Sequence, residues 1–205
     1  METTSRGEDH TTWYGRRKDD RPLARLDRND WIRTAFDALC EGGVDEVRIS
    51  TLCAALGVTK GSFYWHFDDR DALLRAMLEG WERVGTEEII EALDGAEGTA
   101  AERLRRLVGA AFGESSRADR IEAAIRAWAS RDEAAAATVA RVDARRLAYV
   151  RDLLRGAGVS RAIATHRSAI LYRTLIGELT WRSHGGEPLG RAALEQLVCM
   201  LLQPA

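Results

Sequence analysis

Apolar residues recur along most of this chain at the three- and four-residue spacing of helices that bury one face. The first clear case is residues 30–41, with Asn29 placed to cap the helix and Gly42 and Gly43 placed to end it. No stretch alternates apolar and polar residues with the β-branched enrichment of a strand. The pattern therefore predicts an all-α fold.

The same periodicity predicts a long helix over residues 69–93 and a series of helices after it. The expected later helices cover residues 100–113, 118–129, 131–156, 160–183 and 188–202. Prolines occur only at Pro22, Pro188 and Pro204, so none interrupts the interior of an expected helix.

Two very short helices are expected between the first helix and the long one, over residues 51–56 and 60–65. Helices of about six residues are not stable alone, so they must pack across a tight turn against a third helix. Gly57 breaks the first of them and Thr59 is placed to cap the second. This order is that of a helix-turn-helix unit, whose second helix enters the major groove of DNA.

Three aromatic residues of this segment, Phe63, Trp65 and Phe67, are expected to build a small three-helix core. The residues left for the outer surface of the second short helix are Lys60, Gly61, Ser62, Tyr64 and His66. Lysine and serine side chains at the helix start offer donors to base edges, and glycine allows a close approach of the backbone. The free N–H groups at Thr59 suit a phosphate, and the hydroxyl and imidazole groups reach backbone oxygens.

The segment from Ile49 to Leu74 resembles the TetR family of bacterial transcriptional regulators. The resemblance is carried by ALGV at 55–58, TKG at 59–61, FYWHF at 63–67 and RDALL at 70–74. In that family, the positions matching Lys60 and Gly61 lie nearest the bases, and those matching Tyr64 and Arg70 meet phosphates. The residues expected to contact DNA are Arg48, Thr59, Lys60, Gly61, Ser62, Tyr64, His66 and Arg70.

The distribution of charge along the chain indicates which segments can attract DNA. The whole chain has a net charge of −2, and residues 29–68 carry three cations against six acidic residues. Residues 13–28 carry six cations against three acidic residues, directly before the first helix. Because phosphate neutralisation supplies most non-specific affinity, we expect this arm to assist DNA binding. The arm residues considered for this role are Arg16, Arg17, Lys18 and Arg21; a solvated tail without a DNA role is the alternative.

The resemblance implies a body that holds a ligand and dimerises through its last two helices. The candidate pocket residues are Leu107, Phe112, Ile125, Trp128, Tyr149, His166 and Tyr172; plain core packing is the alternative for each. The residues expected at the dimer interface are Ile163, Leu171, Leu175, Leu179, Leu194, Leu197 and Leu201. Helices apolar nearly all round must be covered on two sides, which favours a second subunit over a monomeric bundle.

Other classes of protein find little support. The histidines and the three cysteines are scattered, and no nucleophile elbow, phosphate loop or zinc motif occurs, so we expect no enzyme, metal or cofactor. No membrane span or signal peptide is visible, which predicts a cytoplasmic protein, and the excess of arginine over lysine suits a bacterial source.

Three parts are expected: a flexible basic arm (residues 1–28), a helix-turn-helix domain (residues 29–72) and a ligand-binding and dimerisation domain (residues 73–205). The predicted function is a homodimeric repressor that binds a two-fold symmetric double-stranded DNA operator and is released by an unknown small molecule. The alternatives are an activator or global regulator of the same fold, or a helical small-molecule-binding protein with a vestigial head.

Overall fold

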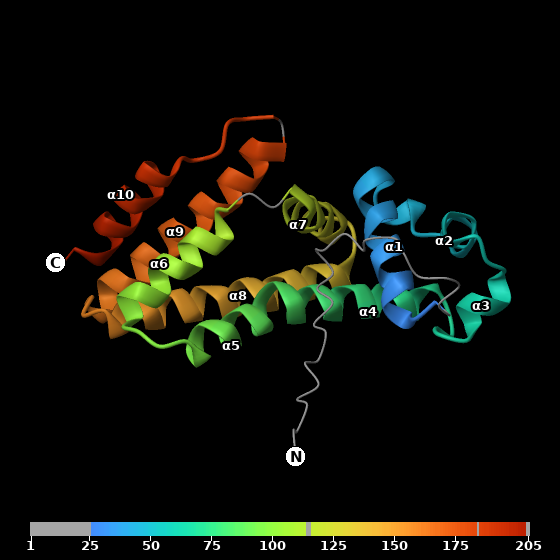
Figure 1. Cartoon of the computed structure of the whole chain (residues 1–205), viewed down its shortest axis with the longest axis horizontal. Helices are drawn as coiled ribbons and strands as arrows, with labels where there is room; N and C mark the ends of the chain where they lie inside the picture. The colour runs from blue at the N-terminus through green and yellow to red at the C-terminus, as the bar shows by residue number, and fades with distance from the viewer. Residues whose placement is uncertain (1–25, 114–115, 184, 204–205) are drawn as a thin grey trace, which may run out of the picture.

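The computed structural model describes residues 26–113, 116–183 and 185–203. These residues form helices and no strand, so the predicted all-α fold is confirmed. A head of three helices lies at one end of an elongated molecule, and the other helices form a body (Figure 1). The head consists of α1 (Arg28–Gly42), α2 (Ile49–Leu56) and α3 (Lys60–Tyr64). The remaining helices are α4 (Arg70–Glu82), α5 (Glu88–Gly95), α6 (Ala100–Ala111), α7 (Ser116–Ala129), α8 (Glu133–Gly156), α9 (Arg161–Ser183) and α10 (Arg191–Leu202).

The first helix begins earlier than predicted because Asp27, and not Asn29, caps it. The Asp27 carboxylate accepts a bond of 2.9 Å from the backbone N–H of Asp30, and the Asp30 carboxylate accepts one of 2.9 Å from the N–H of Asp27. This reciprocal capping box satisfies two N–H groups at the start of α1. The predicted end at the double glycine holds, with Gly43 as the C-cap.

The turn between α2 and α3 depends on Gly57, which has the left-handed angles φ 66° and ψ 32°. Glycine adopts this conformation without the steric cost that a Cβ would add. Thr59 is the N-cap residue of α3, as the sequence predicted. Phe63 and Phe67 then turn inward and are 0% and 3% exposed, which fixes the two short helices to the head core.

Helix α4 joins the head to the body. Leu73 and Met77 of α4 are fully buried in the same core as Phe63 of the head, and that core continues into α7 and α8. The predicted boundary between residues 72 and 73 therefore falls inside a helix that both parts share. Helix α4 is therefore a packed part of both the head and the body.

The chain from α4 into α5 continues as one rod (Figure 1), but its middle is a short π-helix, Arg83–Glu87. The sequence predicted an uninterrupted helix over residues 69–93. Such widened turns often lie at functional sites because they shift the backbone hydrogen bonds by one residue.

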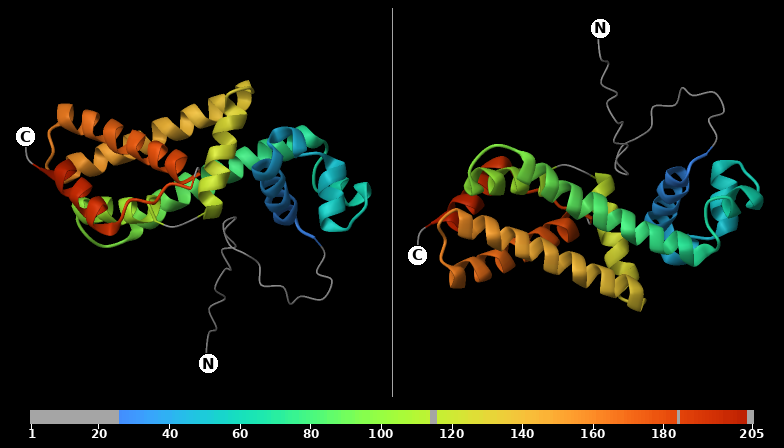
Figure 2. Two further views of the ribbon diagram at one scale, coloured as in Figure 1. Left: turned by 90° about the horizontal axis from the view of Figure 1, so that it is seen from above. Right: turned by 90° about the horizontal axis from the view of Figure 1, so that it is seen from below.

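The body is built around a second core formed by α5, α6, α8, α9 and α10. Helix α7 runs across the molecule between the head and this core, as the views in Figure 2 show. It packs against α1 on one side and against α8 and α9 on the other. No helix in the described part of the chain is long and apolar enough to cross a membrane.

Candidate DNA-binding head and ligand cavity

Helix α3 presents the residues predicted for DNA contact at the tip of the head, far from the body (Figure 1). Thr59, Lys60 and Gly61 are exposed at its start. Tyr64 is 57% exposed at its end, and its ring packs edge-on against that of Phe63, with the two ring centroids 5.4 Å apart. The buried Phe63 thus anchors a helix whose opposite side is open to a partner.

The prediction that Trp65 belongs to the head core is wrong, because 79% of this residue is exposed. Phe63 and Phe67 are four residues apart and occupy the inner side of the helix and its extension, so the residue midway between them faces outward. His66 is half-buried, and its ring centroid lies 6.4 Å from that of Trp31. The outer surface of the head is therefore more aromatic than the sequence suggested.

Arg70 has a structural role that the resemblance did not imply. Its Nε and Nη2 groups donate to the backbone carbonyls of Val47 and Val44, both at 2.6 Å. These bonds tie the start of α4 to the segment that precedes α2. Arg48 is exposed on the same segment, where it donates to the Asp45 carbonyl at 2.7 Å.

The cations of the basic arm, Arg16, Arg17, Lys18 and Arg21, lie outside the described residues, and their contact with DNA stays a prediction. Of the arm's end, Arg28 is described, and its guanidinium lies 4.8 Å from the centroid of the Phe67 ring. A cation–π contact of this kind holds the positive charge beside the helix-turn-helix unit.

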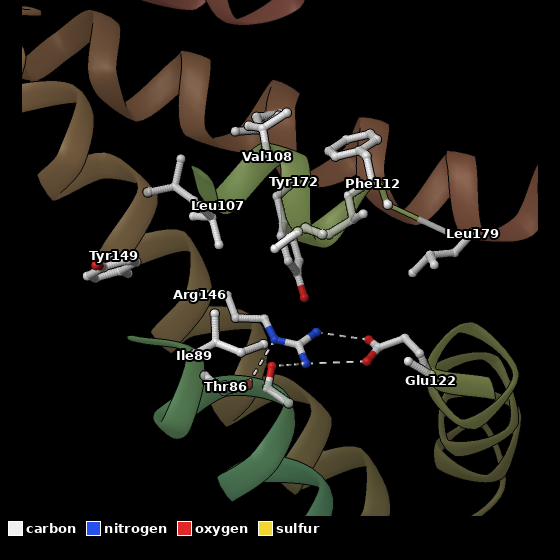
Figure 3. Close-up of a pocket in the computed structure, with 18 of the residues that line it drawn as sticks. Thr86, Ile89, Leu107, Val108, Phe112, Glu122, Arg146, Tyr149, Tyr172 and Leu179 are labelled. Carbon is white, nitrogen blue, oxygen red and sulfur yellow. Dashed lines mark hydrogen bonds and ion pairs between the residues drawn. The ribbon is translucent and has the colours of Figure 1, made fainter. Parts of the chain in front are cut away.

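A cavity of about 290 Å³ lies in the body, bounded by α5, α6, α7, α8 and α9. Four of the predicted pocket residues line it, namely Leu107, Phe112, Tyr149 and Tyr172 (Figure 3). They come from α6 and the residue that follows it, from α8 and from α9, and they lie around one space in Figure 3. Most of the wall is apolar, which suits a small apolar molecule.

Three other pocket predictions are wrong. Ile125 and Trp128 are 0% and 5% exposed, but they belong to the core shared with the head. Helix α7 turns those residues toward the head core while its residues Asp119 and Glu122, three apart, face the cavity. His166 is exposed on α9 and does not line the cavity.

The sequence reasoning missed the polar residues of the cavity, which are Thr86, Asp119, Glu122 and Arg146. Each occurs in a stretch with the composition of a solvated helix surface, as in RADRIE at 117–122. They differ from surface residues because each pairs with a charged side chain of another helix, and no pattern in the local sequence predicts that pairing.

Glu122 is the centre of a charge cluster and is itself buried, with 7% of the residue exposed. Its carboxylate accepts bonds from Trp81 Nε1 at 3.0 Å and from Arg126 Nε at 2.9 Å. It also accepts from both terminal nitrogens of Arg146, at 3.0 and 3.3 Å (Figure 3). Burial alone would raise the pKa of Glu122, but the charges of Arg146 and Arg126 outweigh it and hold the pKa below its usual value.

Arg146 reaches from α8 to the π-helix. Its Nε donates to the Thr86 hydroxyl at 2.9 Å, and its Nη2 donates to the Gly85 carbonyl at 3.0 Å. Its guanidinium also lies 5.3 Å from the Trp81 ring centroid. The widened turn thus receives this arginine, and the cluster connects α4, α7 and α8 at one wall of the cavity.

A second part of the cluster holds Arg126. Its two terminal nitrogens donate to Asp143 at 2.8 and 3.2 Å, and Nη2 also donates to the Tyr172 hydroxyl at 2.9 Å. Tyr172 in turn donates to Asp143 at 2.6 Å. Burial raises the pKa of Tyr172 to about 12, and the positive charge of Arg146, which lowers it, only partly offsets this effect. The Tyr172 hydroxyl therefore stays protonated at neutral pH. We call Glu122, Arg126, Asp143 and Arg146 the Glu122 cluster.

The residues predicted for the dimer interface take part in packing within the chain, and their contact with a second subunit stays a prediction. They are Ile163, Leu171, Leu175, Leu179, Leu194, Leu197 and Leu201, which lie in the second core or along the cavity wall. Leu171, Leu179 and Leu201 are buried within the chain, whereas the other four are only partly buried. Other large apolar side chains are exposed on the same helices, with Ile170 at 57%, Trp181 at 62% and Met200 at 49%.

Comparisons with known proteins agree with the geometry of the head. Residues 32–77 match the model of the family described as bacterial regulatory proteins, tetR family. Over 57 residues the chain is 42% identical to the tetracycline repressor protein class A from transposon 1721 of Escherichia coli. That match covers 28% of this chain and 26% of that protein, so it spans about a quarter of the relative's length.

Two solved structures show that the likeness of the fold extends beyond the head. The reduced form of NemR from E. coli matches 85% of this chain and 95% of its own, with a TM-score of 0.66 and 19% identity. A TetR-like transcriptional regulator from Rhodococcus sp. RHA1 matches 88% of this chain and 96% of its own, with a TM-score of 0.67 and 17% identity. At these identities the two structures establish the fold of the body and nothing more.

The exposed α3 and the glycine turn before it define a helix-turn-helix protein with an attached helical body. Its head is a TetR-family DNA-binding domain, so the resemblance carried by the ALGV, TKG and FYWHF motifs is confirmed.

Proposed function

We propose that this chain is a homodimeric transcriptional repressor that binds a two-fold symmetric operator and leaves it when a small molecule occupies the cavity. The observation that carries the proposal is the position of α4. This helix shares the core of the head, and its Trp81 donates to Glu122 at the cavity wall. A molecule that displaces Glu122 therefore acts on the helix that carries the DNA-binding head.

The DNA contact is proposed for the outer face of α3. Lys60 and Gly61 would approach the base edges in the major groove, with Ser62 beside them, while Tyr64 and His66 would bond phosphates. Thr59 and the free N–H groups at the helix start suit a phosphate as well. The heads of a dimer would occupy half-sites about one helical turn, roughly 34–36 Å, apart.

The second subunit is proposed to cover the outer faces of α9 and α10. Ile170 and Trp181 are eleven residues apart, which is about three helical turns, so they lie on the same side of α9. Both are more than half exposed. Large exposed apolar side chains on one face mark an interaction surface, and a two-fold dimer uses the same surface of both subunits.

Release is proposed to be a shift between two arrangements of the dimer, of which only one has the head spacing that fits DNA. A ligand favours the second arrangement only if it binds that arrangement more tightly. The cavity wall contains both a π-helix and a buried charge cluster, and either can change its bonds when the cavity is filled.

The proposal is tested with the purified full chain and an operator selected from randomised duplexes. Tyr64→Ala should weaken binding to all duplexes alike, while Lys60→Ala should also lose discrimination at one base pair, by about 1–3 kcal/mol. Arg155→Ala is the matched control, because Arg155 is an exposed cation in the last turn of α8, away from the head and not on α9 or α10. Unchanged operator affinity in both head variants contradicts DNA binding by α3, and transcription in vitro distinguishes repression from activation.

A further inference from the structure

A second charged group borders the cavity, apart from the Glu122 cluster. Arg182 of α9 has its Nη2 atom 3.1 Å from Asp119 Oδ2 and its Nε atom 4.0 Å from Glu178 Oε1. The Nη1 atom of Arg182 donates to the carbonyls of Phe112 and Gly113, at 3.2 and 3.0 Å. One guanidinium is thus shared between two carboxylates, which leaves this group with one excess negative charge.

The Glu122 cluster does not offer a comparable charge to a ligand. It holds two guanidiniums, Arg126 and Arg146, against the two carboxylates of Glu122 and Asp143, so its net charge is zero. Each of the four carboxylate oxygens already accepts a hydrogen bond from within the protein. The excess charge at the cavity therefore belongs to the group around Asp119.

Asp119 is the member of this group that lines the cavity, whereas Arg182 and Glu178 lie behind the wall. Burial raises the pKa of Asp119, against the opposing charge of Arg182. The surrounding wall is largely apolar, with Phe112 and Leu179 among its residues. A carboxylate in such a wall binds a positively charged donor well, because a hydrogen bond between opposite charges is strongest where water is excluded.

We propose that the ligand of this cavity is a small, mainly apolar molecule with one protonated amine, and that the amine binds the Asp119 carboxylate. This inference rests on the proposed function of the cavity as the effector site. The volume of about 290 Å³ lies near the lower end of known ligand pockets, which restricts the ligand to a compact body. An organic anion of the same size would be repelled by the Asp119 carboxylate and would find no cationic partner for its own charge beside it.

Three probes with one apolar body separate the head groups: 4-phenylbutylamine, 4-phenylbutanol and 4-phenylbutyrate. Calorimetry with the full chain and no DNA should show the amine binding about 10- to 100-fold more tightly than the alcohol, which is the scale of a hydrogen bond to a charged group. The carboxylate should bind more weakly than both. Asp119→Asn should reduce the affinity for the amine to that for the alcohol and leave the alcohol unchanged.

Glu91→Gln is the control, since it removes one negative charge from an exposed position on α5 outside the cavity wall, and it should bind the amine as the wild type does. If Asp119→Asn does not fold, the three probes on the unaltered chain still decide the question. Equal or tighter binding of the carboxylate overturns the inference, and so does binding of none of the probes. Amine binding without release of the operator supports the inference and counts against the proposed mechanism of release.

Discussion

The buried carboxylate of Glu122 offers the sharpest test of how the body is held together. Glu122→Gln preserves the shape of the side chain but removes its charge and replaces one oxygen acceptor with an amide donor. In the native protein those two oxygens accept bonds from Trp81, Arg126 and Arg146. The amide therefore faces N–H donors that it cannot satisfy.

The magnitude follows from which arginine loses its charge partner. Arg126 retains Asp143, with two bonds of 2.8 and 3.2 Å. Among the described residues, Glu122 is the one carboxylate that pairs with Arg146. Removing one partner of a buried pair costs about 3–5 kcal/mol. Since only one of the two arginines is left uncompensated, we expect a loss near the lower end, about 3 kcal/mol in the free energy of unfolding.

The measurement is urea unfolding followed by circular dichroism, at one fixed protein concentration because the stability of a dimer depends on it. Arg146→Met and the double variant complete a thermodynamic cycle. The double variant should be more stable than the sum of the single losses predicts, because it contains no unpaired guanidinium. A loss below about 1 kcal/mol for Glu122→Gln, or a cycle that is additive within about 0.5 kcal/mol, would refute the reasoning.

Three further predictions concern the acid response, the head and the dimer. In the folded protein the pKa of Glu122 lies below its usual value of 4.5. The ionised carboxylate therefore stabilises the fold above pH 4.5, and this stabilisation is lost as the pH falls below that value. Acid should consequently destabilise the wild type more steeply than Glu122→Gln. Arg70→Ala should lower both the melting temperature and the operator affinity, whereas Tyr64→Ala should lower only the affinity; equal melting temperatures would contradict the bracing role of Arg70. Ile170→Glu should yield monomers in sedimentation without loss of helix content, and an intact dimer would move the interface elsewhere.

The head could be predicted from the sequence because its structure depends on local signals. Gly57 permits the left-handed turn, and the apolar residues Phe63 and Phe67 recur at one-turn spacing. The error at Trp65 has the same origin: hydrophobicity indicated burial, but the helix geometry places this residue opposite its neighbours. Where hydrophobicity and periodicity disagree within a helix, periodicity was the better guide here.

The cavity was only half predictable for a different reason. Its aromatic residues Tyr149 and Tyr172 stand out in a sequence with few aromatics, but its charged residues do not. Glu122 and Arg146 are 24 residues apart on different helices, and their pairing depends on how α7 crosses α8. The subunit contact of α9 and α10 is likewise not decided by the sequence, because a wide apolar arc does not tell which half is covered within the chain.

Helix α7 connects the proposed ligand contact to the head by two routes. Arg117, at its start, is hydrogen-bonded to Asp37 of α1, and Glu122, near its middle, accepts from Trp81 of α4. A change from 1% to 99% of the released arrangement requires a differential binding energy of about 5.5 kcal/mol. A dimer with two cavities needs about half of that from each ligand, which is the scale of one hydrogen bond to a charged group, about 1.5–3 kcal/mol. One amine bound to Asp119 in each of the two cavities, one turn of α7 before Glu122, would therefore be sufficient in energy to release the operator, provided that the bond forms only in the released arrangement.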